Sequence, residues 1–351
     1  MIEKIHSNIL IRAPNWLGDT LMSTPGVSAV RKIFPKAKLS ILAKSVFCRF
    51  WKDFPGVDEV ISYEKGFSKI LKVASQLKKN KFDMALVFPT SFSSAFIVFL
   101  AEIPIRIGWG GEGRDLFLTQ VVPHPRPRQK HLVLEYMDLV QKGLETSLKP
   151  VPEKLICAIS DKSRKEIAHA WQAAGLTAKS SPIALAPGAT YGPAKRWPLP
   201  YWKELIGFLL ADRKESILIV GGREEEDYLR PLIEGFPPKY KSRIRIFVGR
   251  TSPTLLAAML SKCKILVTND TGPMHVAAAV GTPTVALFGS TSPTWTMPFG
   301  IGHEVIYKQL GCSPCFQRTC PIGYKCLHAI NVDDVYKAVQ KILHKPKKIK
   351  G

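Results

Sequence analysis

The chain lacks any apolar run long enough to cross a bilayer. Its longest apolar run near the middle, residues 95–101, falls far short of the roughly 20 residues that a spanning helix needs. Residues 1–8 are polar, and the apolar segment after them has only the length of a strand, so no secretory signal is expected. We therefore expect a cytosolic protein that touches membranes only from outside.

Acidic residues are scarce relative to basic ones. Asp and Glu number 28 against 50 Lys and Arg, which gives a formal net charge of +22. This excess predicts an anionic partner, which could be nucleic acid, an acidic lipid surface or a phosphorylated substrate. The composition, 46% hydrophobic and 22% charged, is that of a globular protein, and 351 residues predict two domains of roughly 150–180 residues each.

Two common nucleotide signatures are also missing. A dinucleotide-binding domain needs G-x-G-x-x-G between a strand and a helix, and the nearest stretch, residues 108–113, has the wrong spacing and no apolar helix directly after it. A Walker lysine motif is absent. No isolated Asp-x-Asp offers a metal site, because the only approximation is the acidic run at residues 224–227, which lies at a helix start. These absences argue against a nicotinamide-binding domain.

Strands and helices are expected to alternate in both halves of the chain. In the first half we predict strands at 8–12, 38–42, 57–62, 84–88 and 105–107, helices at 20–34, 67–79, 91–100 and 132–144, and a loop at 108–128. After a linker at 149–154 and a helix at 161–174, we predict strands at 183–186, 216–220, 244–247, 265–267 and 284–288, and helices at 201–211, 225–234, 253–261, 273–280 and 332–344. This alternation predicts two Rossmann-like α/β domains with parallel sheets.

In open parallel sheets, ligands bind beyond the carboxyl ends of the strands, so the turns there are candidate sites. The turn at residues 268–272 precedes a helix expected to begin near Pro273. Asn269 or Asp270 suits an N-cap, and the free N–H groups of the helix start can bind a phosphate. His275 lies one turn into that helix. An ordinary capped connection is the alternative interpretation.

Three other turns carry polar side chains of the same kind. The loop at residues 187–198 combines glycines and hydroxyls with Lys195 and Arg196, which suits a diphosphate, although it could be a solvated basic loop. Asp19 stands at a helix start, as a structural cap or as a general base beside a cleft. The acidic run beginning at Glu224 either complements a helix dipole or provides one carboxylate for a ribose diol.

Three motifs together resemble a known family. They are residues 15–19 (NWLGD), 187–198 (PGATYGPAKRWP) and 269–278 (NDTGPMHVAA), supported by residues 89–95 and 106–109. They resemble the ADP-heptose:lipopolysaccharide heptosyltransferases of glycosyltransferase family 9, most closely the heptosyltransferase II branch. The resemblance implies an α/β GT-B fold, two Rossmann-like domains facing each other across a cleft. It implies an acceptor-binding domain at residues 1–178, a nucleotide-sugar domain at 179–330, and a C-terminal helix and basic tail at 331–351 that pack back toward the N-terminal domain.

The resemblance also implies an activity. It is the inverting, metal-independent transfer of heptose from ADP-L-glycero-D-manno-heptose to the first heptose of the lipopolysaccharide inner core. The acceptor would be Kdo-lipid A carrying heptose, at the cytoplasmic face of the inner membrane, with no nucleic acid as partner and no catalytic cofactor. Another family 9 transferase with a different acceptor, such as heptosyltransferase I, is one alternative. A basic, zinc-containing nucleic-acid binder is a second, but the sequence lacks the interleaved basic and aromatic residues this class requires.

Residue roles follow from the resemblance, motif by motif. Asp19 would be the base that takes a proton from the acceptor, and Lys195 would stabilise the leaving diphosphate. Glu225 would bind the adenosine ribose, with Glu224 and Glu226 as substitutes. The other donor-binding residues would be Thr190, Tyr191, Asp270, Thr271, Gly272 and His275, with Tyr191 at a position where relatives outside this branch carry threonine. The acceptor contacts would be Asn15, Ser91, Arg106 and Arg114, with Arg126 and Arg128 nearby.

Four of the seven cysteines form a cluster near the C-terminus. Cys312, Cys315, Cys320 and Cys326 have the spacing C-x2-C-x4-C-x5-C. Four thiols this close in a reducing compartment can close a tetrahedral structural zinc site, or hold an iron–sulfur cluster, or remain free. A cytosolic chain with this usage is not expected to have a disulfide framework.

Overall fold

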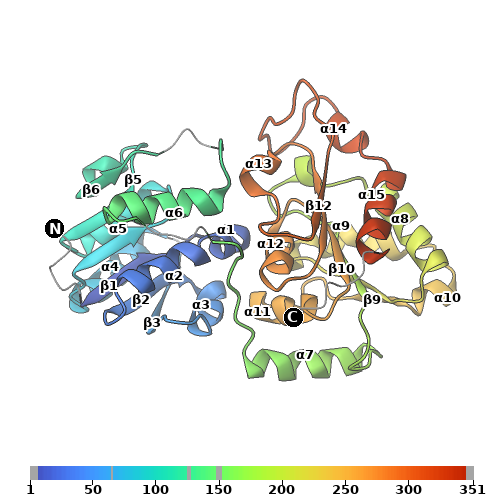
Figure 1. Ribbon diagram of the computed structural model, residues 1–351, viewed down its shortest axis with the longest axis horizontal. Coiled ribbons are helices and arrows are strands. Elements are labelled where there is room, and N and C mark those ends of the chain that lie inside the picture. Colours follow the sequence, from blue (N-terminus) through green and yellow to red (C-terminus); the bar gives the residue numbers. More distant parts are fainter. Residues whose placement is uncertain (1–6, 65, 125–127, 148–151, 345–351) are drawn as a thin grey trace. The chain divides into compact units, whose positions relative to one another are not determined.

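The computed structural model describes residues 7–64, 66–124, 128–147 and 152–344. The chain forms two compact units, and the division falls between Ala158 and Ile159. Each unit is one sheet with helices on both of its faces (Figure 1). Among the described residues, no helix is both long enough and apolar enough to cross a membrane.

The first unit is built on a six-stranded sheet in the order β3-β2-β1-β4-β5-β6, with every neighbouring pair parallel. The central strand is fully buried at Ile9, Leu10 and Ile11, as expected where helices cover both faces of a sheet. The strands are β1 (Asn8–Arg12), β2 (Lys38–Lys44), β3 (Glu59–Tyr63), β4 (Met84–Val87), β5 (Ile105–Trp109) and β6 (Gln120–Val122).

The helices of this unit differ from the prediction at two places. The helix predicted at residues 20–34 is two helices that meet at Ser23, because Pro25 lies in a first turn, where its missing N–H is tolerated. The helix at Ser45–Lys52 was not predicted, since its aromatic residues are typical of strands. The helices are α1 (Leu17–Met22), α2 (Thr24–Ile33), α3 (Ser45–Lys52), α4 (Phe67–Lys79), α5 (Phe92–Leu100), η1 (Arg114–Leu116) and α6 (Leu132–Gly143).

The second unit repeats the same strand order. Its sheet is β12-β11-β10-β7-β8-β9, so both sheets, numbered within their units, follow the 3-2-1-4-5-6 order of doubly wound nucleotide-binding sheets. The edge strands β6 and β12 were not predicted, because they lie in polar, turn-rich stretches. The strands are β7 (Ile183–Ala186), β8 (Ile217–Ile219), β9 (Ile244–Ile246), β10 (Ile265–Asn269), β11 (Thr284–Phe288) and β12 (His303–Tyr307).

The last helix packs into the core of the second unit. Val332, Val335 and Val339 belong to the same buried cluster as Trp197 and Trp202, and the helix lies beside α8 (Figure 1). The expectation that this helix and the basic tail pack back toward the N-terminal domain stays a prediction, and the tail at 345–351 lies outside the described residues. The helices are α7 (Asp161–Ala173), η2 (Pro193–Lys195), α8 (Leu199–Asp212), η3 (Arg223–Glu225), α9 (Glu226–Leu229), η4 (Arg230–Ile233), α10 (Pro238–Lys241), α11 (Pro253–Leu260), α12 (Gly272–Ala279), α13 (Pro293–Thr296), α14 (Lys325–His328) and α15 (Val332–His344).

The boundary between the units lies earlier than the predicted 178/179. Helix α7 buries Ile167 and Trp171 and packs on α11, and Arg245 of β9 donates a hydrogen bond to the carbonyl of Ala174 directly after it. These contacts attach α7 to the second unit. Residues 149–151 of the predicted linker lie outside the described residues.

Candidate functional site

The strongest candidate site of the second unit lies where β7 and β10 end. These strands are neighbours in the sheet. From β7 the chain continues to β8 and β9 on one side, and from β10 it continues to β11 and β12 on the other side. Open α/β sheets bind ligands at such a reversal of strand order. Asn269, at the end of β10, is fully buried. Its Nδ2 donates to the carbonyls of Pro187 (2.7 Å) and Gly188 (3.2 Å), and its Oδ1 accepts from the backbone N–H of Trp197 (3.1 Å). One side chain thus holds both ends of the predicted diphosphate loop against β10.

Lys195 and Asp270 form an ion pair at the centre of this edge. The Nζ of Lys195 lies 2.6 Å from Oδ2 of Asp270, and their side chains are only 14% and 4% exposed. Thr291 donates to the same oxygen (2.6 Å), and Thr296 donates to Oδ1 (3.4 Å). The structure therefore brings together a cation, a carboxylate and two hydroxyls from the segments that follow β7, β10 and β11. A charged or hydroxyl-bearing ligand could replace some of these contacts.

The loop that carries Lys195 is fastened to the segment after β12. The hydroxyl of Tyr191 donates to the carbonyl of Phe316 (2.6 Å), and the N–H of Ala194 donates to the carbonyl of Arg318 (3.0 Å). The Tyr191 ring centroid lies 4.8 Å from Nζ of Lys195 and 5.3 Å from Cζ of Arg318. Its hydroxyl is thus engaged with the main chain, and its ring contacts the lysine.

Helix α12 begins one residue earlier than predicted, at Gly272, and Thr271 is its N-cap. The prediction that Asn269 or Asp270 caps this helix is wrong, because both side chains are engaged across the sheet edge instead. The Thr271 side chain makes no capping hydrogen bond, Pro273 has no N–H, and the N–H of Met274 donates to the carbonyl of Thr271 (3.0 Å). A helix start without a side-chain cap suits an anion. His275 lies buried in the same helix.

Glu225 is a buried carboxylate beside this loop. It is 4% exposed, and its Oε2 accepts from the N–H of Gly222 (2.9 Å), while its Oε1 has no hydrogen-bond partner among the described residues. A Cβ built on Gly188 would lie 2.2 Å from this carboxylate, so a larger residue there would displace the Glu225 carboxylate from its present position. Burial raises the pKa of Glu225. An unsatisfied buried acceptor of this kind suits a hydroxyl donor from a ligand.

The two neighbouring glutamates have different surroundings. Glu224 is exposed and accepts a hydrogen bond from Thr190 (2.9 Å), and Glu226 is exposed as well. Of the three candidates for the ribose, Glu225 alone combines burial with an unpartnered oxygen among the described residues. Thr190 itself lies at the exposed rim of the site.

In the first unit, Asn15 follows β1 at the equivalent edge. Its Oδ1 accepts from Nη2 of Arg12 (2.8 Å) and from the hydroxyl of Tyr63. Arg12 is fully buried, and burial lowers its pKa to about 10. Its guanidinium also donates to the Ala13 carbonyl and to Tyr63. These contacts fix the turn between β1 and α1.

Asp19 is the third residue of α1, as its predicted place at a helix start requires, and is half-buried. Burial, together with the charges of Asp19 and Glu135, holds the pKa of the Tyr136 hydroxyl well above its usual range, so the Asp19 carboxylate lies near that hydroxyl. Its assignment as a base stays a prediction.

The other predicted acceptor residues lie in three places: Ser91 after β4, Arg106 in β5 and Arg114 in η1. Ser91 is the N-cap residue of α5, and Arg106 donates to the carbonyl of Phe117 (2.6 Å). Arg114 is buried and donates to the carbonyl of Trp109 (3.0 Å). Arg106 therefore holds the segment after β5, and Arg114 holds the end of β5; direct contact of either with an acceptor stays a prediction.

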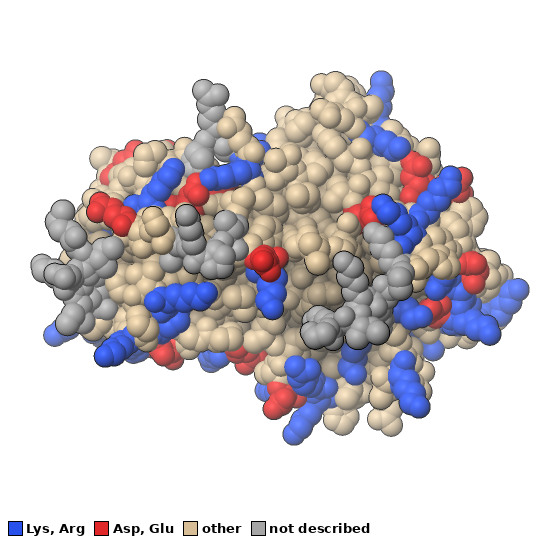
Figure 2. All heavy atoms as spheres, in the orientation of Figure 1, with Lys and Arg blue, Asp and Glu red and all other residues tan. Residues whose placement is uncertain are grey.

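Basic residues do not gather into one stripe on the face that Figure 2 shows. Lys and Arg side chains are spread over that face and interspersed with Asp and Glu. This distribution gives no support to the nucleic-acid alternative. Arg126 lies outside the described residues, and the backbone N–H of Arg128 donates to Glu135 (3.3 Å).

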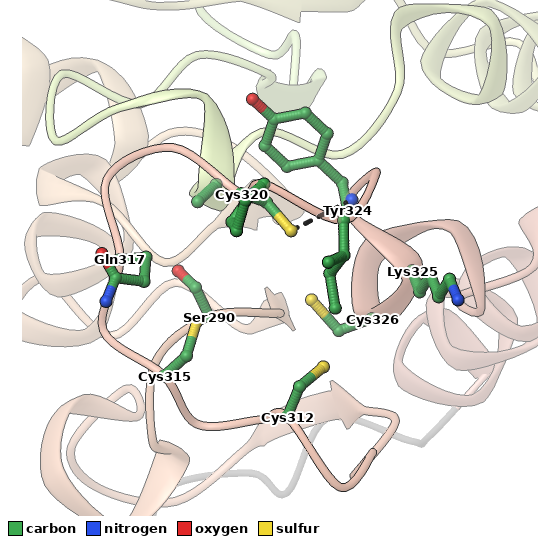
Figure 3. Close-up of a pocket in the computed structure, with 11 residues that line it drawn as sticks. Ser290, Cys312, Cys315, Gln317, Cys320, Tyr324, Lys325 and Cys326 are labelled. Carbon is green, nitrogen blue, oxygen red and sulfur yellow. Dashed lines mark hydrogen bonds between the residues drawn. The ribbon is translucent and has the colours of Figure 1, made fainter.

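The four clustered cysteines line a single pocket with Ser290, and all seven cysteines are free (Figure 3). Burial raises the pKa of the Cys326 thiol, and the other three thiols raise it further. The other three thiols therefore lie close enough to Cys326 to affect its ionisation. In the part of the chain that the structure describes, no three His, Cys, Asp or Glu side chains are placed to hold a metal ion.

Sequence reasoning missed Thr291 and the Arg12–Tyr63 contact. Thr291 follows β11, a strand that was predicted, and β11 is the neighbour of β10. Its turn therefore lies at the same sheet edge as Asp270, and the run Gly289-Ser290-Thr291-Ser292 was the signal. A buried arginine at the end of β1 gave no comparable signal, because its partner comes from a distant strand.

Comparisons with known proteins agree with this geometry. Residues 70–325 match the model of glycosyltransferase family 9 (heptosyltransferase). The chain is 30% identical to lipopolysaccharide heptosyltransferase 2 of Escherichia coli K12, over 85% of this chain and 87% of that protein. It is also 30% identical to the enzyme of that name from Salmonella typhimurium, over 96% and 97%.

A solved structure, that of E. coli ADP-heptose lps heptosyltransferase II, is 26% identical, with a TM-score of 0.82 over 96% of this chain and 98% of that one. The predicted α/β class with GT-B architecture is thereby confirmed. The chain belongs to glycosyltransferase family 9, the heptosyltransferase family, and is a glycosyltransferase.

Proposed function

We propose that this protein transfers heptose from ADP-L-glycero-D-manno-heptose to the first heptose of the lipopolysaccharide inner core. The observation that carries the proposal is the Lys195–Asp270 pair, flanked by hydroxyls and the uncapped start of α12. This is a site for a diphosphate joined to a polyhydroxyl sugar. The choice of heptose rests on similarity to proteins named lipopolysaccharide heptosyltransferase 2 and ADP-heptose lps heptosyltransferase II.

The reaction we propose is a single displacement that inverts the anomeric carbon. The acceptor hydroxyl loses its proton to Asp19 and attacks that carbon, while the bond to ADP breaks and the electron pair leaves with the diphosphate. Lys195, Thr190 and the N–H groups at the start of α12, with Thr271, Gly272 and His275, would stabilise the leaving charge. These groups supply the stabilisation that other transferases take from a metal.

The donor would lie on the second unit. In this proposal Lys195 moves part of its interaction from Asp270 to the diphosphate, which frees the Asp270 carboxylate to accept from sugar hydroxyls. The ribose diol would donate to the unpartnered Oε1 of Glu225. Tyr191 would act by holding Lys195 through its ring rather than by donating its hydroxyl to a phosphate.

The acceptor would lie on the first unit, with Asn15, Ser91, Arg106 and Arg114 as its contacts. Kdo-lipid A carrying heptose is anionic, so the surplus of basic residues favours it. An acceptor of this kind is anchored in a membrane. We therefore place the enzyme in the cytoplasm, peripheral to the inner membrane.

The experiment that tests the function is incubation with ADP-heptose and three lipopolysaccharide cores, truncated after no, one or two heptoses. We expect one heptose to be added to the core that already carries one. Transfer to another core instead would favour a different family 9 transferase, such as heptosyltransferase I, over the proposed one. No transfer to any of the three would refute heptosyl transfer.

Replacing Glu225 by glutamine should weaken ADP binding about 10-fold or more, because a hydrogen bond to a charged group contributes roughly 1.5–3 kcal/mol. The same variant should melt at a higher temperature at pH 7. Burial raises the pKa of this carboxyl, so the folded state loses stability as the pH rises through that pKa, and a neutral amide avoids the loss. Calorimetry with ADP and thermal unfolding at several pH values measure both effects.

The gain in melting temperature should shrink as the pH falls toward 4, where the carboxyl of the wild type is also neutral. Glu226→Gln, at an exposed neighbour, is the matched control and should change neither quantity. Unchanged ADP affinity in the Glu225→Gln variant would show that Glu225 does not bind the donor.

A structural zinc at the four cysteines is part of the same proposal, separate from the catalytic chemistry. In its support, four free thiols surround one pocket (Figure 3). Closing a tetrahedral site would require the side chains to turn inward and lose their protons, because no three of them are so placed among the described residues. We expect about one zinc per chain in protein purified reduced and without chelator. Metal analysis near zero would contradict this, and iron with visible absorbance would indicate an iron–sulfur cluster.

A further inference from the structure

Helix α5 has two apolar faces, and only one of them is buried. Ala95 and Val98 pack into the core of the first unit. Phe92, Phe96 and Phe99, spaced i, i+4 and i+7, share the opposite face, where Phe92 is 49% and Phe99 40% exposed. The helix carries no charged residue. A helix that is apolar on nearly all sides normally contacts a partner or a membrane.

The outer face of α5 continues into the segment after β5. The Phe117 ring lies 4.9 Å from that of Phe92, 5.2 Å from Phe96 and 5.2 Å from Phe99, centroid to centroid. Leu116, next to it, is 80% exposed. We call these four rings and Leu116 the aromatic cluster. Apolar side chains gathered in one exposed patch mark an interaction surface more often than single exposed residues do.

Basic residues lie beside the aromatic cluster. The guanidinium of Arg106 is 5.5 Å from the centroid of the Phe99 ring. The neighbouring helix α4 packs against α5, carries four lysines and no acidic residue, and exposes Phe67 and Leu71 in addition. Aromatic side chains with adjacent cations suit the interface of an anionic bilayer, where each basic residue adds attraction.

The aromatic cluster is also continuous with the predicted acceptor loops. Phe92 directly follows Ser91, and Arg114, two residues before Leu116, ties its loop to the one after β4 through the carbonyl of Thr90. A saccharide anchored in a lipid would have to reach this edge of the sheet from the membrane. A second copy of the chain fits the patch less well, because both copies would carry a net charge of +22.

We propose that the aromatic cluster docks this protein on the surface of an anionic phospholipid bilayer, with Phe92, Phe99 and Leu116 inserted among the lipid headgroups. This docking proposal depends on the proposed heptosyl transfer in one argument only, the continuity of the cluster with the predicted acceptor loops. The cluster and its neighbouring cations would bind a bilayer that contains no saccharide at all.

The test is sedimentation of the full chain with vesicles of phosphatidylglycerol and phosphatidylethanolamine, compared with pure phosphatidylcholine. We expect binding to the anionic vesicles only. A Phe92→Gln/Leu116→Gln double variant should reduce it at least 10-fold. The control is Ile301→Gln, which changes a 98% exposed apolar residue in the second unit and should bind like the wild type.

Folding of the double variant is checked by thermal unfolding, and Leu116→Gln alone, at a highly exposed position, should already lower vesicle binding severalfold. Turnover on a deacylated, water-soluble core should be unchanged in both variants. Equal vesicle binding by variants and wild type, or a concentration-dependent dimer that the substitutions abolish, would overturn the proposal. If the protein binds vesicles but transfers no heptose, the proposed function is refuted and the docking proposal stands.

Discussion

The Asp19→Asn variant should lose about 10²–10⁴-fold in kcat, the range that a positioned general base contributes. In the proposed reaction Asp19 accepts the proton of the acceptor hydroxyl, and an asparagine amide keeps the size of the side chain but cannot accept a proton. Its affinity for ADP should stay at the wild-type value, because the donor residues all belong to the second unit. Turnover at saturating substrates and calorimetry with ADP measure the two quantities.

The matched control is Glu102→Gln, the same chemical change at an exposed carboxylate of the first unit. It should keep both kcat and ADP affinity. Wild-type turnover in Asp19→Asn would refute the assigned base. A fall in kcat together with a lower melting temperature would identify a structural role at the start of α1 instead, and thermal unfolding distinguishes the two.

The Lys195→Ala variant should lose about 10²–10³-fold in kcat, the effect of removing one donor to a developing negative charge. The ammonium lies at the sheet edge where the diphosphate would bind, 2.6 Å from Asp270. The same change leaves the Asp270 carboxylate buried without its cation, which typically costs about 3–5 kcal/mol of folding stability. Activity and melting temperature should therefore both fall.

A double variant separates catalysis from folding. Lys195→Ala with Asp270→Asn removes both charges, so the melting temperature should recover while kcat stays low. Lys195→Arg keeps a cation beside Asp270 and should fold normally, with partial activity because the guanidinium is larger and differently shaped. Recovery of wild-type turnover in the double variant would show that Lys195 serves only the fold.

Much of the fold follows from local patterns in the sequence. The strands β1 and β7 are short apolar runs followed by polar turns, and parallel strands buried on both faces produce that pattern. The misses are at positions where local and tertiary preferences differ. The helix α3 is rich in aromatic residues because it buries Phe47, Phe50 and Trp51, and the edge strands β6 and β12 exist because a neighbouring strand pairs with them.

The candidate site divides in the same way. The turns that hold Lys195 and Asp270 can be found from sequence, because each follows an apolar run and precedes a helix. Their contact cannot, because the two residues are 75 positions apart and meet only since β10 pairs with β7 and Asn269 ties the loops together. Asp270 was expected as a helix cap and as a contact for the donor sugar. The cap is wrong, because a distant lysine engages its carboxylate, and the sugar contact stays a prediction.

The sequence by itself determined the fold class, the family and the loops that carry the candidate site, because these depend on periodicity and on short motifs. Only the tertiary structure decided which side chains share a site. It buries Glu225 against Gly188, fastens Tyr191 to the segment after β12 and packs α15 into the second core. Each of these contacts joins residues far apart in the chain, and strand order and burial, which no local pattern specifies, bring them together.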